Sequence, residues 1–475
     1  MIDTTLIKDR LLYLALQGKL VEQKTTDESA SKMVSRVSKE LNGVDFKANY
    51  DASEIPFDIP DNWCWCRLSD IGRTNIGLTY HPEDIVNDGT IVVRSSNIIN
   101  GKMDYNDIVK VNCSIRDNQY LDNNDIVICA RNGSKALVGK CAIYEGDSRT
   151  VAFGAFMAVF RTQFFKYVYY YFQTPVFRRY FSNDDTKQIN QVTQSILKNA
   201  WIPLPPYEEQ IRIVDKVEEI LAVLDNIDSL QSQYATNVEV LKSKLIDAGI
   251  RGKLTEQLPE DGNAEDLYNQ IQDEKARLIK EGKIKKEKPL PEITKGEIPF
   301  NIPKNWKWVR LGDISTKISS GNTPAGGKNS NVYVENGYCF FREQNIYDDG
   351  IHEEGLVYIT EELLKTRGNS TVLPMDILLN ITGGSIGRCA LIPDNFTKGS
   401  INQHILIIRM IDPRLRFYVH KCICSPYVQK YIKGNVVGDK DGFSGGRCKN
   451  MLIPLPPLDE QKRIVEKLET LLGQL

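Results

Sequence analysis

Residues 54–63 read EIPFDIPDNW, and residues 297–306 read EIPFNIPKNW. Both copies of this opening block continue through a second tryptophan, Trp65 or Trp308, into the pattern Arg-Leu-x-Asp-Ile. A match of this length between distant parts of one chain is the signature of an internal duplication. The sequence therefore predicts two copies of one structural unit.

Two further blocks show how the duplicated unit is arranged along the chain. A closing block reads IPLPPYEEQIRIV at 202–214 and IPLPPLDEQKRIV at 453–465. A third block reads GKLVEQ at 18–23, before the first opening block, and GKLTEQ at 252–257, between the two copies. The repeat is therefore circular, because the chain opens with the end of a unit and closes with the beginning of one. Such an arrangement lets one chain approximate a two-fold object.

The segments between the opening and closing blocks diverge strongly. Residues 72–200 and 315–451 share only fragments, such as Asp125-Ile126 with Asp376-Ile377. Their apolar runs are short and are separated by Asn, Gly and Asp turns, which is typical of β-strands. We predict an α/β (α+β) fold in which two similar mixed α/β domains are joined by long antiparallel coiled-coil helices in a pseudo-two-fold, circular arrangement.

A heptad pattern follows the first closing block. Apolar side chains alternate in steps of four and three, with one polar interruption, at Ile213, Val217, Ile220, Leu224, Ile227, Gln231, Tyr234, Val238, Leu241 and Leu245. Such a seam needs a partner helix. The register recurs in the C-terminal segment at Ile464, Leu468, Leu471 and Leu475, and Ile7 and Leu11 fit its far end. An equivalent of residues 225–239 is missing after Leu475, so either the partner is shorter than the central helix or the chain is truncated.

These patterns predict six parts along the chain. They are an N-terminal helical segment that completes the circular repeat (1–50), a first divergent domain (51–203), a central coiled-coil helix (204–257), a polar, Lys/Glu-rich helix and linker (258–297), a second divergent domain (298–454) and a C-terminal helix (455–475).

The composition is that of a soluble globular protein, with 41% hydrophobic and 26% charged residues in 475. No signal peptide and no apolar run of about 18 residues is apparent, and ten cysteines without an export signal suggest a reducing cytoplasm. The cysteines form no CxxC pair and the four histidines are not clustered near them, so no metal site is expected.

Net charge is −2, which is unusual for a protein that binds DNA. The charge is uneven, however. Residues 60–201 carry 16 basic against 14 acidic side chains, and residues 303–452 carry 19 against 14. Both divergent domains are thus more basic than the rest of the chain, which is the direction that a DNA reader on an acidic scaffold would need. Excesses of this size are also ordinary for domains of this length, so charge alone decides nothing.

The opening block, the closing block before a coiled-coil helix and the circular repeat together resemble the specificity (S) subunits of type I restriction-modification enzymes. The resemblance covers nearly the whole chain. It implies that each divergent domain is a target recognition domain that reads one half of an asymmetric, bipartite DNA site, and that the helices act as a ruler for the spacer between the halves.

The resemblance also implies partners. Two methyltransferase (modification) subunits would dock on the helical regions, and two restriction/translocase subunits would attach to them. These partners would carry out adenine methylation or ATP-dependent cleavage, so S-adenosylmethionine, ATP and Mg would belong to them and not to this chain. The chain itself is expected to be a non-catalytic, cytoplasmic protein that binds double-stranded DNA.

Candidate DNA contacts are Arg, Lys, Asn, Gln and His side chains in the divergent domains, since such groups pair with base edges or reach phosphates. They are Arg94, Asn97, Arg131, Asn132, Lys140, Lys187, Gln188, Asn190 and Gln191 in the first domain, and Arg342, Gln344, Asn345, Arg388, Asn402, Gln403, His404, Lys440 and Arg447 in the second. Each is alternatively a solvated turn or a cap. Arg94/Arg342 and Asn97/Asn345 recur in both copies, which favours a shared structural or phosphate role. The paired tryptophans are expected to pack in the core.

Two motifs approach catalytic signatures without matching them. Leu204-Pro205-Pro206-Tyr207 lacks the polar first residue with which amino-methyltransferases hold their target amine, and residues 321–329 lack the first Gly and the final Ser/Thr of a phosphate-binding loop. A fused restriction-methylation enzyme is therefore a weak alternative. The other alternative is a scaffold or adaptor that does not recognise DNA.

Overall fold

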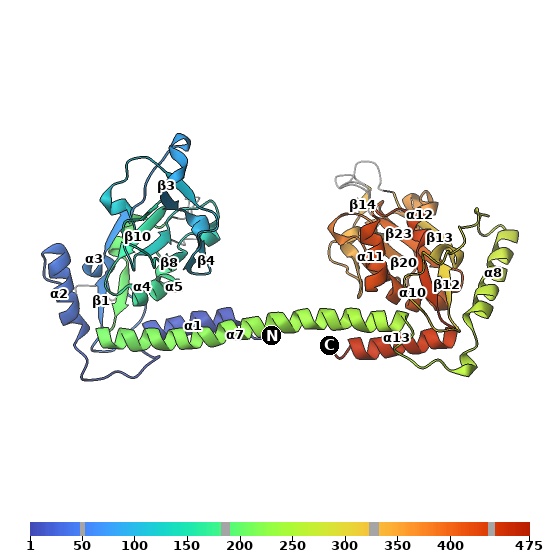
Figure 1. Ribbon diagram of the computed structural model, residues 1–475, viewed down its shortest axis with the longest axis horizontal. Helices are drawn as coiled ribbons and strands as arrows, with labels where there is room; N and C mark the ends of the chain where they lie inside the picture. The colour runs from blue at the N-terminus through green and yellow to red at the C-terminus, as the bar shows by residue number, and fades with distance from the viewer. Residues whose placement is uncertain (48–52, 182–190, 323–331, 436–441) are drawn as a thin grey trace. The chain divides into compact units, whose positions relative to one another are not determined.

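The computed structural model describes residues 1–47, 53–181, 191–322, 332–435 and 442–475. Two compact units divide the chain, residues 1–233 and residues 234–475. The 44-residue helix α7 (Tyr207–Ile250) contributes its first part to one unit and its last part to the other (Figure 1). Within the described ranges, no helix is long and apolar enough to cross a membrane.

The first unit is built around a four-stranded antiparallel sheet. Its strands lie in the order β2 (Arg73–Ile76), β10 (Met157–Arg161), β7 (Ile126–Cys129) and β8 (Cys141–Ile143). The run Ile-Val-Ile-Cys of β7 is buried on both faces, as a continuous apolar strand requires. A second sheet contains β6 (Val109–Val111), β3 (Ile85–Val93) and β9 (Val151–Phe153), and β4 (Ile98–Ile99) pairs with β5 (Lys102–Met103).

Aromatic residues attach the helices of the first unit to its sheets. Tyr167 and Tyr171 of α4 (Phe165–Phe172) donate their hydroxyls to the carbonyls of Pro203 and Trp201, at 2.7 and 2.8 Å. Both acceptors lie in β11 (Trp201–Leu204), so α4 is fixed to the strand that precedes α7. The unit's other helices are α1 (Thr4–Leu16), α2 (Ala30–Asn42), α3 (Leu68–Ile71), α5 (Pro175–Arg178) and α6 (Gln194–Asn199).

The second unit repeats this plan. Its antiparallel sheet has the order β13 (Ser315–Ser320), β23 (Ile405–Met410), β20 (Ile377–Asn380) and β21 (Cys389–Leu391). A five-stranded sheet has the order β14 (Tyr333–Val334), β18 (Val357–Ile359), β15 (Tyr338–Phe341), β22 (Gly399–Ile401) and β19 (Thr371–Val372), and β16 (Ile346–Tyr347) pairs with β17 (Gly350–Ile351). Its helices include α8 (Ala264–Lys280), α9 (Glu361–Lys365), α10 (Arg416–Ile423), α11 (Pro426–Gly434) and α12 (Gly445–Asn450).

The opening and closing blocks of each copy form one two-stranded ladder. In the first unit β1 (Cys64–Arg67) pairs antiparallel with β11, and Cys64 lies opposite Leu204. In the second unit β12 (Lys307–Arg310) pairs in the same way with β24 (Leu452–Leu455). The repeated sequences are therefore the scaffold that closes each unit, and the divergent segments are the sheets between them.

All three repeated blocks of the first unit meet at one buried carboxylate. Glu209 of the closing block accepts the indole N–H of Trp63 at 3.0 Å and the amide N–H of Gln23 at 3.0 Å. Trp63 belongs to the opening block and Gln23 to the third block. Nearby, a Cβ on Gly18, whose φ is +67°, would lie 2.5 Å from Pro60, so this backbone position needs glycine.

The second unit contains the same junction. Glu460 accepts the indole N–H of Trp306 and the amide N–H of Gln257, both at 2.8 Å. A Cβ on Gly252, with φ of +68°, would lie 2.4 Å from Pro303. The three blocks of the circular repeat inferred from the sequence therefore make the same contacts in both units. The placement of the first tryptophan of each pair in the core is also confirmed, since Trp63 and Trp306 are buried.

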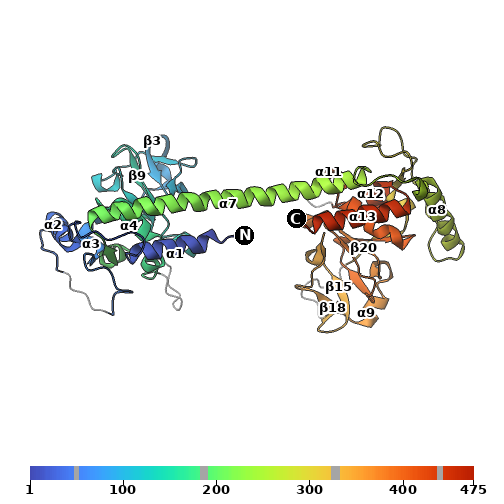
Figure 2. The same ribbon diagram turned by 90° about the horizontal axis from the view of Figure 1, so that it is seen from below.

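Short helices cover the two ends of α7 (Figures 1 and 2). In the first unit α1 runs antiparallel to α7, because Thr4 contacts Asp228 at 2.7 Å while Leu16 and Ile213 line one small cavity. In the second unit Gly249 of α7 packs against Ile464 of α13 (Leu458–Leu472).

The heptad seam is covered at its ends and open between them. Ile213, Val217 and Leu224 are buried, as the heptad pattern predicts. Tyr234 and Leu241 are 61% and 42% exposed, although the same pattern places them on the seam. The side-chain amide of Gln231 donates to the carbonyl of Ile2 at 3.1 Å, so the N-terminal segment reaches this point of α7.

Candidate functional site

The sheet end at which β7 stops and β10 starts forms an exposed turn region in the first unit. The backbone N–H of Ala130, directly after β7, donates to the carbonyl of Phe156, directly before β10, at 2.9 Å. The carbonyl of Ala130 accepts the N–H of Val192, also at 2.9 Å. Arg131 and Gln191 form an isolated antiparallel bridge beside these bonds. Three separate segments are therefore fixed at one place by their backbones.

The second unit builds the corresponding sheet end with the same bonds. The N–H of Ile381, directly after β20, donates to the carbonyl of His404, directly before β23, at 2.9 Å. The carbonyl of Ile381 accepts the N–H of Phe443 at 2.8 Å. Thr382, His404 and Gly442 thus occupy the backbone positions that Arg131, Phe156 and Gln191 occupy in the first unit. We call these three positions the variable triplet.

The variable triplet of the first unit presents a cation, an aromatic ring and an amide. Arg131 and Gln191 are exposed, and Phe156 is 63% exposed. The Arg131 guanidinium lies 5.9 Å from the centroid of the Phe156 ring, within the range of a cation–π contact. A solvent-facing guanidinium supported by an exposed ring provides both donors and an apolar face.

The variable triplet of the second unit presents different chemistry on the same frame. The Thr382 hydroxyl lies 2.6 Å from Nδ1 of His404, so the hydroxyl fixes the imidazole. Gly442 has no room for a side chain, because a Cβ there would lie 2.3 Å from the carbonyl oxygen of Ile381. A hydroxyl and an imidazole therefore replace the guanidinium, the ring and the amide of the first unit.

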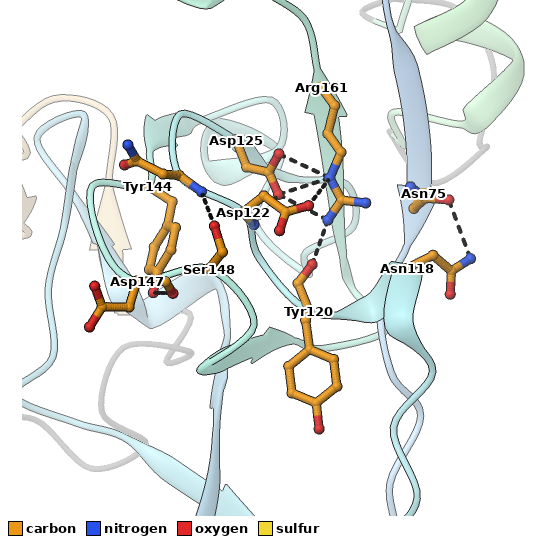
Figure 3. A network of polar contacts seen from close by, with 10 residues as sticks. Asn75, Asn118, Tyr120, Asp122, Asp125, Tyr144, Asp147, Ser148 and Arg161 are labelled. Carbon is orange, nitrogen blue, oxygen red and sulfur yellow. Dashed lines mark hydrogen bonds and ion pairs between the residues drawn. The ribbon is translucent and has the colours of Figure 1, made fainter.

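An ion pair secures the opposite end of the same strands (Figure 3). Nε of Arg161, at the end of β10, lies 3.0 Å from Oδ1 of Asp125, which directly precedes β7. Burial raises the pKa of Asp125, while the hydrogen bonds from Arg161 oppose that shift. In the second unit Arg409 and Asp376 make the same pair at 2.7 Å. The recurring Asp-Ile fragments are thus structural, and they hold the strands that carry the variable triplet.

A family model for the type I restriction modification DNA specificity domain matches residues 60–236 and 303–475. The chain belongs to this family. The two matches coincide with the two copies of the repeat, so each unit of this specificity protein carries one domain.

Curated relatives agree with that membership, and a solved structure shares the fold. The chain is 25% identical to the type I restriction enzyme EcoAI specificity subunit of Escherichia coli, over 98% of this chain and 88% of the relative. It is 25% identical to the EcoKI specificity subunit of Escherichia coli strain K12, over 87% of this chain and 82% of the relative. A solved structure described as the basis of complex assembly and conformational transition of the type I R-M system has a TM-score of 0.60 at 20% identity, covering 88% of this chain and 92% of that one.

Three asparagines predicted as DNA contacts have structural roles in this specificity-family fold. Asn97 is fully buried, and its side-chain amide donates to the carbonyls of Asp104 and Asp107. Asn345 is buried in the same way. Asn402 is 5% exposed and donates to Glu343 at 2.7 Å. These predictions are corrected because each amide is used inside the protein, as the recurrence of Asn97 and Asn345 in both copies suggested.

The recurring arginines border the same turns. The backbone N–H of Arg94 donates to Oδ1 of Asn97 at 2.8 Å, and its guanidinium pairs with Asp107 at 2.9 Å. The guanidinium of Arg342 donates to the carbonyl of Gly355. Both side chains are half-buried, and their contact with DNA stays a prediction.

The other predicted residues form three groups. Asn132 donates to Ser95 at 3.0 Å, Lys140 donates to the carbonyl of Ile98 at 2.9 Å, and Arg388 lies over the Tyr347 ring at 4.4 Å. These residues lie on the loops that follow β7 and β20, near the variable triplet. Gln344 and Gln403 are exposed, and Arg447 donates to the carbonyl of Asn435. Lys187, Gln188, Asn190 and Lys440 lie outside the described residues.

Sequence reasoning missed two members of the variable triplet. Phe156 was overlooked because an apolar residue beside a buried strand is normally a core residue. Thr382 was overlooked because threonine in a Gly-rich turn is ordinary. Aligning the two copies through Asp125 and Asp376 places Arg131 opposite Thr382, and that contrast would have found Thr382, whereas no sequence signal marks Phe156.

Within the described ranges, no group of three His, Cys, Asp or Glu side chains is arranged to hold a metal ion. The Leu-Pro-Pro-Tyr motif has a structural position: Leu204 is buried in β11, and the carbonyl of Pro205 accepts the Gln210 amide at 2.8 Å.

Proposed function

We propose that this chain is the DNA sequence-recognition subunit of a type I restriction-modification complex and that it binds an asymmetric, bipartite site. One observation carries the proposal. Two units with the same scaffold hold different side chains at equivalent positions, which are exposed in the first unit and half-buried in the second. Scaffolds stay alike when they meet identical partners, whereas surfaces diverge when they read different base pairs. The names of the relatives, all specificity subunits, support this assignment.

The chain supplies specificity, and its partners supply the chemistry. In this proposal, methyltransferase subunits bring S-adenosylmethionine, and restriction/translocase subunits bring ATP and Mg. Each half of the bound site positions one methyltransferase for adenine methylation, and unmethylated sites lead to ATP-dependent cleavage.

The duplicated scaffold supports a pairwise assembly. Arg212 pairs with Asp27 at 2.6 Å in the first unit, and Arg463 pairs with Asp261 at 2.6 Å in the second. Two equivalent helix ends offer two equivalent surfaces to one kind of partner. We therefore propose two methyltransferase subunits for each chain, with two restriction/translocase subunits attached to them. Native mass spectrometry of the complex tests this stoichiometry, and a complex with a single methyltransferase at saturation contradicts it.

Methylome sequencing tests the proposed function. A host without methylation of its own receives the chain together with its methyltransferase partner, and control hosts receive either protein alone. We expect methylated adenines in one motif with two specified halves and an unspecified spacer, and only when both proteins are present. Methylation by the chain alone indicates a fused enzyme. A stable complex without motif-specific methylation or DNA binding indicates an adaptor.

A further inference from the structure

At the variable triplet the two units share their backbone hydrogen bonds but differ in their side chains. The backbone bonds agree within 0.1 Å between the units, at 2.9 and 2.9 Å in the first and 2.9 and 2.8 Å in the second. The same ion pair anchors the far end of the strands in each unit. Side chains at the triplet therefore start from equivalent backbone positions and differ only in chemistry.

A structural role does not account for the side chains of the first triplet. Phe156 belongs to none of the core clusters of the described chain and exposes 63% of its surface. The bond that places Phe156 uses its backbone carbonyl, so it does not require an aromatic side chain. An exposed phenylalanine next to an exposed arginine gains its apolar and electrostatic contacts when another molecule covers it.

We infer that the variable triplet determines which base pair each unit selects at one position of its half-site. This inference rests on the proposed function. In the first unit Arg131 reads a guanine in the major groove, and Phe156 covers the apolar surface of the neighbouring base or its methyl group. In the second unit His404, held by Thr382, reads a different base. Arg131, Phe156, Thr382 and His404 are thus specificity-determining residues.

The chemistry of the two triplets supports this division. A guanidinium presents a planar fork of donors that matches O6 and N7 of guanine, and an exposed phenyl ring suits a thymine methyl. The imidazole of His404 has one ring nitrogen beyond the one next to Thr382, and this Nε2 lies 3.4 Å from the side-chain nitrogen of Gln403, so the ring cannot form the bidentate pair. Gly442 adds no side chain where the first unit has Gln191. The first half-site therefore depends on a guanine that the second triplet does not select.

Exchange of the triplet side chains tests the inference in the intact chain with its methyltransferase partner. Variant one carries Arg131→Thr and Phe156→His, and variant two carries Thr382→Arg and His404→Phe. Methylome sequencing reads both half-sites, so the untouched half is an internal control. Arg116→Thr, which removes an exposed arginine from another loop of the first unit, is the matched control.

We expect variant one to change or relax one base pair of one half-site, with preference for its guanine falling about 10-fold or more, because the bidentate pair between Arg131 and the guanine is lost. Variant two should change one base pair of the other half-site, and Arg116→Thr should leave the motif unchanged. Full methylation of an unchanged motif by both variants overturns the inference, and so does a change in both halves by either variant. If one variant fails to fold, the other decides. If the unaltered chain gives no motif, the proposed function fails, and the inference with it.

Discussion

Trp63 donates its indole N–H to the carboxylate of Glu209 at 3.0 Å, across 146 residues of chain. The corresponding bond joins Trp306 to Glu460 at 2.8 Å. These bonds explain why the tryptophan and the Glu-Gln pair appear in both copies of the sequence. The carboxylates are fully buried, so each one must receive donors to remain in the protein interior.

Replacement of Glu460 by alanine should destabilise the second unit by about 1–3 kcal/mol, because it leaves the buried indole N–H of Trp306 without its acceptor. Hydrogen exchange with mass spectrometry at increasing urea concentration measures the loss unit by unit. Glu466→Ala, on the exposed side of the same helix, is the control and should have little effect. Equal protection in Glu460→Ala and the unaltered chain would show that the junction does not stabilise the unit.

The ion pair between Arg463 and Asp261 should make the second unit sensitive to acid. Hydrogen bonding from Arg463 lowers the pKa of Asp261 below its ordinary value. A carboxyl group with a lowered pKa in the folded state stabilises the fold above its unfolded pKa, which is about 3.9, and this contribution is lost as the pH falls through the folded pKa. Asp261→Asn should therefore reduce stability at pH 7 and weaken its decline below about pH 4. Thermal unfolding of Asp261→Asn and of the exposed control Glu260→Gln from pH 2 to pH 7 tests this. Parallel pH profiles for both variants contradict it.

The length of α7 should set the spacer of the recognised site, since this helix is the segment of chain that connects the two units. Four residues inserted after Gln233 add about 6 Å at about 1.5 Å per residue, which corresponds to nearly two base pairs of about 3.4 Å. Four residues also make about one helical turn, so the seam stays near register. We expect methylation mapping to show a spacer longer by one or two base pairs with both half-sites unchanged. A two-residue insertion rotates the seam and should reduce stability. An unchanged spacer with full activity would show that the length of α7 does not set the distance between the half-sites.

Cys424 should be the most reactive thiol of the second unit. The hydrogen bond from Cys389, assisted by His420 at 3.7 Å, holds the pKa of Cys424 below its usual value, whereas burial raises the pKa of Cys422. More thiolate at neutral pH means faster alkylation of the half-buried Cys424. Iodoacetamide labelling at pH 7, followed by peptide mass spectrometry, should modify Cys424 first. His420→Gln should slow that reaction, and labelling of Cys422 at the same rate would refute the prediction.

The sequence predicted the scaffold better than the surface, and particular residues show why. Glu209, Trp63 and Gln23 each lie in a block that recurs in the second copy, so the duplication marked these blocks as scaffold, and the structure then showed that the three side chains meet. Burial of Ile213 and Val217 followed from heptad spacing, because helical periodicity is local information. The exposure of Tyr234 did not follow, since it depends on where the partner helix ends.

The surface residues were harder to predict because the same types of side chain serve as turn caps and as DNA ligands. Asn97 was a candidate DNA contact in the sequence, yet its amide closes a buried turn. Phe156 reads as a core residue, yet it is exposed. Phe156 lies beside Arg131 only because its carbonyl accepts the N–H of Ala130. That hydrogen bond joins segments that sequence spacing does not connect.

The circular repeat also sets the order in which the two units can fold during synthesis on the ribosome. Every block that the first unit needs lies within residues 1–233, so that unit can close around Glu209 while the rest of the chain is still being made. The second unit waits for Glu460, which follows both of its partners in the sequence, so Trp306 and Gln257 find their acceptor only after the second closing block has been made. A nascent chain released before the second closing block would hold one complete unit and an unpaired β12, and unpaired strand edges of this kind pair with other chains and aggregate.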